Sequence, residues 1–140
     1  MGGAHEKELL GRLVSLSRKL SLLLLEQTDQ VLPFAITLDP AGKKPQTFYP
    51  ADSRPDATWE QLLDAAADWL MASVASGSVA AVAVVTLLNS DDQRSGIGVQ
   101  IETVHSGMLH VYPLEKGTDG WVLHELVRID TPIVEPVWPP

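Results

Sequence analysis

The stretch VAAVAVVTLL at residues 79–88 decides the fold, because it is apolar at odd and even positions alike. Successive side chains of a strand point to opposite faces of a sheet, so this run predicts a strand with both faces covered. We therefore place residues 79–88 at the centre of a sheet. Residues 97–102, IGVQIE, alternate apolar with polar or small side chains, which is typical of a half-buried strand beside it.

A short turn at Ser106 and Gly107 predicts a hairpin that leads from this second strand into residues 108–114. Closing the hairpin at that turn gathers the apolar residues of both strands on one face, as a half-buried hairpin requires. The pairs expected from this register are Val99 with Leu114, Ile101 with Tyr112, and Thr103 with His110.

Two helices are predicted before the central strand, over residues 5–26 and 58–76. Thr58 and Gln61 have the spacing of a capping box at the start of the second helix, and Gly77 marks its end. Trp59 and Trp69 are expected near its buried side. The buried stripe expected at helical spacing is Leu62, Leu63, Ala66, Trp69, Leu70, Ser73 and Val74.

The rest of the chain supplies further strands at residues 33–38, 46–49 and 121–130, with a polar loop at 51–57. The order is α-β-β-α-β-β-β, without the regular alternation of a parallel fold. We therefore predict an α+β fold, with an antiparallel sheet of about five strands packed against two helices. Residues 1–130 are expected to form a single domain, and the proline-rich residues 131–140 an extended C-terminal arm.

The composition narrows the function classes. The 140 residues include ten Lys or Arg against eighteen Asp or Glu, giving a formal net charge of −8, and there is no cysteine. The absence of cysteine excludes disulfides, thiolate nucleophiles and cysteine-ligated metals. The negative net charge opposes binding to nucleic-acid phosphates and to anionic membranes. Charged residues flank the four leucines at 22–25, so this stretch has the pattern of neither a signal peptide nor a membrane span. We expect a cytoplasmic protein with neither nucleic acid nor membrane as a partner.

The second predicted helix contains carboxylates but no Lys or Arg. Glu60, Asp64 and Asp68 are four residues apart and share one face, with Met71 beside them. Like charges at this spacing oppose the helix slightly, and the helix dipole favours only Glu60 in the first turn. The stripe has two interpretations: a solvated face that aids solubility, or a docking surface for a basic protein that comprises Glu60, Asp64, Asp68 and Met71.

The histidines offer a second candidate site. In the expected hairpin register, His105 and His110 point to the same side, and His124 or Glu125 could complete a pocket between sheet and helices. No spacing such as HExxH supplies a metal set, so no metal is expected, and the histidines fit ordinary sheet and turn positions.

Nucleophile motifs are absent. The sequence has neither a GxSxG elbow nor an SxxK motif, and its serines near glycine occur in turn contexts. Gly96-Ile97-Gly98 lacks the third glycine and the following helix of a dinucleotide fingerprint. The sequence therefore predicts no cofactor and favours a noncatalytic protein, while the histidine pocket keeps a hydrolytic domain open.

Strand and turn patterns over most of the chain carry a resemblance. They are residues 33–35 (PFA), 39–42 (DPAG), 84–86 (VVT), 97–102 (IGVQIE) and 112–113 (YP). With these, the chain resembles small uncharacterised bacterial α+β proteins. The resemblance implies a bacterial cytosolic setting and no active residue.

Two functional hypotheses follow. The first is a noncatalytic acidic interaction domain that binds a basic partner and forms a homodimer through the first helix, whose second half is apolar on more than one face. An immunity or antitoxin-like role fits its charge by analogy. The second is a small-ligand-binding or hydrolytic domain that uses the histidine pocket.

Overall fold

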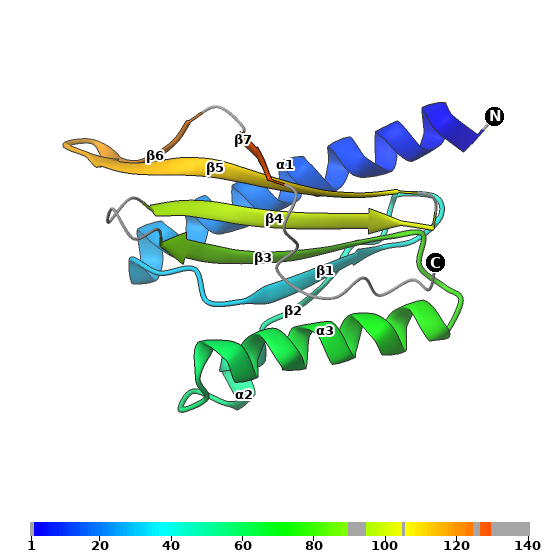
Figure 1. Ribbon diagram of the computed structural model, residues 1–140, viewed down its shortest axis with the longest axis horizontal. Helices are drawn as coiled ribbons and strands as arrows, with labels where there is room; N and C mark the ends of the chain where they lie inside the picture. The colour runs from blue at the N-terminus through cyan, green and yellow to red at the C-terminus, as the bar shows by residue number, and fades with distance from the viewer. Residues whose placement is uncertain (1, 90–94, 105, 125–126, 130–140) are drawn as a thin grey trace.

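The computed structural model describes residues 2–89, 95–104, 106–124 and 127–129 of the chain (Figure 1). Three helices are present in this part of the chain: α1 (Gly2–Thr28), α2 (Pro50–Ser53) and α3 (Trp59–Ala75). The strands are β1 (Phe34–Leu38), β2 (Gln46–Phe48), β3 (Ala81–Asn89), β4 (Ser95–Thr103), β5 (Gly107–Gly117), β6 (Gly120–Leu123) and β7 (Val127–Ile129).

The predicted α+β class is confirmed. The strands form one antiparallel sheet in the order β2-β1-β3-β4-β5-β6, and β7 also pairs with β5. The sheet has seven strands rather than about five. All six stretches that were expected to be extended are strands, and the last of them, at 121–130, contains two. β6 and β7 pair with different parts of β5. The loop expected at 51–57 contains the short helix α2, which Pro50 favours because its fixed φ suits a first helical turn.

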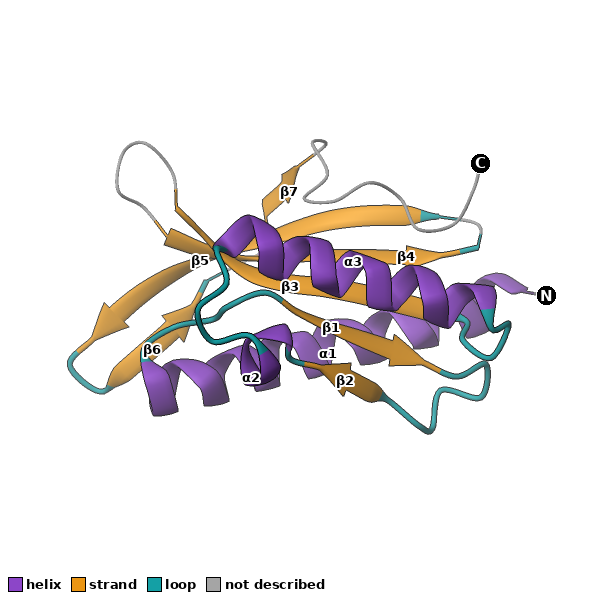
Figure 2. Cartoon of the chain, turned by 90° about the horizontal axis from the view of Figure 1, so that it is seen from below, coloured by secondary structure: helices purple, strands orange, loops and turns teal. Residues whose placement is uncertain are grey.

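The central position expected for residues 79–88 is confirmed by β3, which pairs with β1 on one side and β4 on the other. α1 and α3 lie on opposite faces of the sheet (Figure 2). Ala83 and Val85 belong to the core beneath α1, whereas Val82 and Val84 pack with the residues of α3. Both faces of β3 are therefore buried, which explains the missing polar alternation.

The predicted hairpin register is wrong. Val99 pairs with His110 rather than with Leu114, because the turn comes earlier than Ser106 and Gly107. The backbone N–H of Thr103 donates to the carbonyl of Ser106 at 2.8 Å, and the Thr103 hydroxyl accepts from the Ser106 N–H at 3.1 Å. These bonds close the turn before β5 begins. The observed pairing is shifted from the predicted pairing by an even number of residues, so each side chain lies on the face of the sheet that was predicted for it.

α1 packs its leucines against its own sheet. Leu9, Leu13 and Leu25 are buried, and Leu16, Leu20 and Leu24 are among the partly buried residues around the same core. Ser17 and Ser21 occupy the same buried stripe between Leu13 and Leu25, and both are fully buried. Leu23 is exposed at 42%. Most of the leucines that suggested a dimer thus pack within the chain's own core.

α3 begins and ends where the sequence predicted. The Thr58 hydroxyl accepts from the backbone N–H of Gln61, and the Gln61 side chain accepts from the N–H of Thr58, so the capping box is formed. Gly77 follows with a φ of 77°, a conformation that glycine adopts without steric cost. The buried residues of the helix are Leu62, Leu63, Ala66 and Leu70.

No helix in the described part of the chain is both long and apolar enough to cross a membrane. The arm predicted at residues 131–140 lies outside the described residues.

Candidate functional site

The carboxylate stripe lies on the outer face of α3. Glu60, Asp64 and Asp68 are exposed, and Met71 is exposed at 54%. Within the described part of the chain, no Lys, Arg or His lies within ion-pair distance of these three carboxylates. The structure therefore brings the four predicted residues together on one accessible face.

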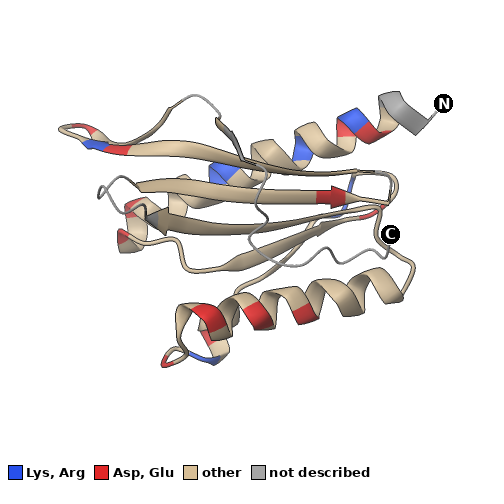
Figure 3. Ribbon diagram, in the orientation of Figure 1, with Lys and Arg blue, Asp and Glu red and all other residues tan. Residues whose placement is uncertain are grey.

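Charge is distributed unevenly between the two long helices. α3 contains acidic residues and no Lys or Arg, whereas α1 carries Lys7, Arg12, Arg18 and Lys19 (Figure 3). Like charges four residues apart oppose a helix by about 0.2–0.5 kcal/mol per pair. The capping box and the burial of the opposite side of α3 offset this small cost, so the stripe is compatible with a stable fold.

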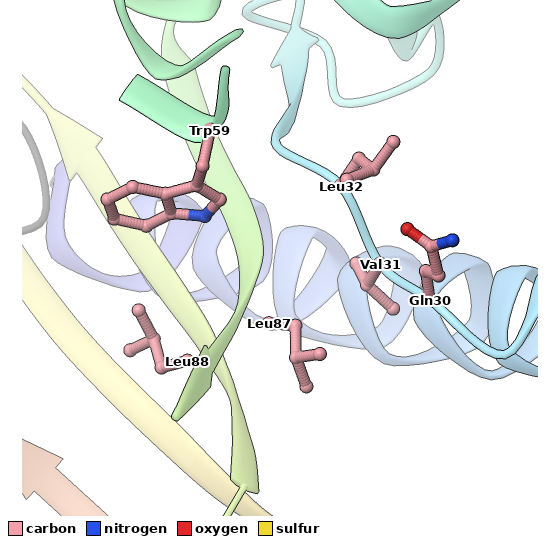
Figure 4. Close-up of a pocket in the computed structure, with 6 residues that line it drawn as sticks. All are labelled: Gln30, Val31, Leu32, Trp59, Leu87 and Leu88. Atoms are coloured by element: carbon pink, nitrogen blue, oxygen red, sulfur yellow. The ribbon is translucent and has the colours of Figure 1, made fainter. Parts of the chain in front are cut away.

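An apolar hollow opens at the start of α3. It has a volume of about 440 Å³ and lies between Trp59, the end of β3 and the chain segment before β1 (Figure 4). The residues that line it are Gln30, Val31, Leu32, Trp59, Leu87 and Leu88. Most of this lining is apolar, which is typical of a site that takes an apolar group.

Trp59 is the most unusual residue of the hollow. The sequence placed it near the buried side of its helix, and it lies on the side that faces the sheet, but 39% of the residue is exposed, so it is not a core residue. Its indole N–H donates to the hydroxyl of the buried Thr86 at 3.0 Å. The hydrogen bond fixes the position of the ring, and the apolar ring surface remains accessible at the hollow.

A second hollow of about 240 Å³ adjoins the first. The two share Gln30 and Leu32, and Leu32 is exposed at 41%. Tyr49 and Asp52 line the second hollow on the side of α2, with Leu24, Thr28, Pro33 and Ala51. Burial raises the pKa of the Tyr49 hydroxyl. The two hollows are therefore neighbours, and the second has a carboxylate in its lining.

The described histidines do not converge. His110 is buried on the α1 face of β5, where its Nδ1 lies 3.4 Å from the Tyr112 hydroxyl. His124 is largely exposed, and its Nε2 lies 2.9 Å from a carboxylate oxygen of Glu115. Leu114 and Leu123, which pair with each other, belong to the α1 face, so Glu115 and His124 belong to the other face.

The remaining members of that predicted pocket, His105 and Glu125, lie outside the described residues. Among the described residues, no group of three or more His, Cys, Asp or Glu side chains could hold a metal ion. Burial raises the pKa of the Tyr112 hydroxyl, while the guanidinium of Arg18, 5.1 Å from the ring centroid, partly opposes that shift. The surroundings of His110 are thus those of a core residue.

Sequence reasoning found the stripe but missed the hollow. The hollow combines residues from three distant segments, and none of them shows a motif by itself. One weak signal existed, namely Trp59 directly after the capping residue Thr58, because the first turn of a helix is often solvent-accessible.

Comparisons of the chain with models of known families, with curated proteins and with solved structures find no match. Its function is therefore inferred from its own residues and geometry.

Proposed function

We propose that the chain is a noncatalytic protein-interaction domain that binds a basic partner, in the cytoplasm, through the outer face of α3. The observation that carries the proposal is the exposed stripe of Glu60, Asp64 and Asp68, without a cation in the described structure to neutralise it. Such a surface attracts a positively charged partner and speeds its association.

An exposed apolar residue beside the stripe favours docking over simple solvation. Met71 lies on the same face of α3 as the carboxylates and exposes more than half of its surface. Trp59, on the sheet-facing side at the start of the same helix, also exposes more than a third of its surface. A face that served only for solubility would gain nothing from an exposed methionine there. Protein interfaces, in contrast, are enriched in methionine and aromatic residues, with charged residues around them.

The two other hypotheses have less support. Self-association through α1 was expected from its leucines, but these pack on the sheet, and Leu23 is the one large apolar residue of α1 that is exposed in the described structure. A hydrolytic pocket needs convergent acids and bases, whereas His110 and His124 belong to opposite faces of the sheet.

Selection from a random peptide display library tests the proposal and does not require an identified partner. The library is selected against the wild-type domain, and the affinities of the enriched peptides are then measured for purified variants. We expect enrichment of Lys and Arg, affinities that fall with added salt, and a loss of about tenfold or more for the double variant Asp64→Lys/Asp68→Lys.

The matched control is Glu8→Lys/Asp119→Lys, which changes the net charge by the same amount at exposed positions away from α3. It should bind the selected peptides almost as well as the wild type does. Circular dichroism melts must show that both variants are folded. Peptides without positive charge, or equal losses in both double variants, would refute the proposal.

A further inference from the structure

The walls of the larger hollow are held by hydrogen bonds. The backbone N–H of Leu87 donates to the carbonyl of Val31 at 3.0 Å, which joins the end of β3 to the segment before β1. The indole N–H of Trp59 donates a hydrogen bond to the hydroxyl of Thr86, which also lies in β3. Since both walls are connected through β3, the hollow is preformed, and a ligand need not order it on binding.

The exposed residues of the hollow differ from the scattered apolar residues that any surface has. Leu32 and Trp59 come from different segments and expose 41% and 39% of their surfaces, yet both line the same hollow. Leu87 and Leu88, at the end of β3, also line it and are themselves only partly buried. Burying this lining under a partner removes apolar surface from water, which favours binding of an apolar group.

The charge around the hollow selects among apolar partners. Asp52 lines the adjoining hollow, Asp56 is exposed between α2 and α3, and Glu60 directly follows Trp59. Arg54 is the one basic residue between Pro50 and Asp68. An apolar group flanked by positive charges fits this surface, and a cation can also bind over the face of an exposed tryptophan.

We infer that the hollow lined by Leu32, Trp59 and Leu88 is an anchor site that receives one large apolar side chain of a basic partner segment. Its volume of about 440 Å³ accommodates a leucine or phenylalanine side chain. The inference rests on the proposed function, to which it adds the chemistry of the partner. The stripe on α3 attracts a basic segment, and the anchor selects a segment with a leucine or phenylalanine among its lysines.

Three synthetic peptides test the anchor. They share the sequence acetyl-Lys-Lys-Gly-Xaa-Gly-Lys-Lys-amide, with leucine, phenylalanine or serine at Xaa, so their charge is identical. Affinities are measured by NMR titration of the wild-type domain at low salt. Burial of the anchor should make the leucine and phenylalanine peptides bind about tenfold more tightly than the serine peptide.

Two leucine variants locate the effect. Leu32→Ser should reduce the preference for leucine over serine to about one. Leu23→Ser is the matched control, because Leu23 is equally exposed at 42% and lines neither hollow. It should keep the full preference. In the wild type, the indole N–H resonance of Trp59, assigned with Trp59→Phe, should shift with the leucine peptide more than with the serine peptide, which tests the site even if Leu32→Ser folds poorly.

The outcomes separate the anchor from the stripe. Equal affinities of the wild type for the leucine and serine peptides, or an unchanged Trp59 resonance, would overturn the anchor while leaving the charge-based proposal standing. A preference for leucine that survives Asp64→Lys/Asp68→Lys, with all affinities reduced, supports both. If that variant binds every peptide as the wild type does but the preference remains, the anchor stands and the role of the stripe fails.

Discussion

Replacing Ser17 and Ser21 by alanine should stabilise the protein. Both serines lie in the stripe of α1 that faces the sheet, and both are fully buried. Neither hydroxyl oxygen has a hydrogen-bond partner among the described residues. In the unfolded chain the same hydroxyls bind water, so folding deprives each of its hydrogen bonds without replacing them.

The magnitude follows from three contributions. A buried hydroxyl without a partner costs about 1–3 kcal/mol. Alanine also has the higher helix propensity, by roughly half a kcal/mol. The small void left by the missing oxygen opposes both gains, because the lining atoms lose contacts. We therefore expect about 1 kcal/mol of stabilisation for each substitution and about 2 kcal/mol for the double variant, close to 6 °C in melting temperature.

Urea denaturation measures the free energy of unfolding, and Ser15→Ala provides the matched control. Ser15 is exposed on the same helix, so its replacement reports helix propensity without the burial contribution. The gains at Ser17 and Ser21 should exceed that at Ser15, with an unchanged dependence on urea. A double variant less stable than the wild type, or gains no larger than the control, would refute the reasoning, since the hydroxyls would then have partners in solution.

Three further predictions follow. Thr58→Ala removes one bond of the capping box and should cost about 1 kcal/mol in thermal or urea unfolding; an unchanged stability would mean that the cap is not formed. Gly42→Ala should cost about 1–3 kcal/mol, because Gly42 has a φ of 72° and an added Cβ would lie 3.1 Å from Leu9; a stable variant would contradict that turn geometry. The backbone N–H groups of Lys44 and Lys43 hold the pKa of Asp39 below its ordinary value of 3.8. Because the folded pKa is the lower one, this contribution is present above the unfolded pKa and is lost as pH falls through the folded pKa. NMR titration should give a midpoint below 3.8, and Asp39→Asn should lose stability less steeply below about pH 4; a midpoint at or above 3.8 would show that the bonds are absent.

Short-range periodicity was enough to predict most elements. The run at residues 79–88 indicated a strand buried on both faces, and β3 has that position. The capping box at Thr58 located the start of α3, and four-residue spacing placed Glu60, Asp64 and Asp68 on one exposed face. These features depend on the geometry of a single helix or strand, which neighbouring residues determine.

Choices among local alternatives needed the tertiary structure. Leucines surround the second half of α1, so apolarity alone does not select its inward face, and packing on the sheet buries Ser17 and Ser21 instead of Leu23. In the hairpin, the predicted turn and the observed turn differ by an even number of residues, so both put the apolar residues of the two strands on the same face. Hydrogen bonds of Thr103 select the earlier turn, and the faces of the strands are unchanged.

The sequence by itself determined the fold class, the central strand, the limits of α3 and the carboxylate stripe, because each follows from residues close together in the chain. The hollow was decided by the tertiary structure alone. Leu32, Trp59 and Leu87 become neighbours only when β3 pairs with β1 and α3 packs across them. Contacts over such separations depend on how the whole sheet closes, and no local pattern encodes that closure.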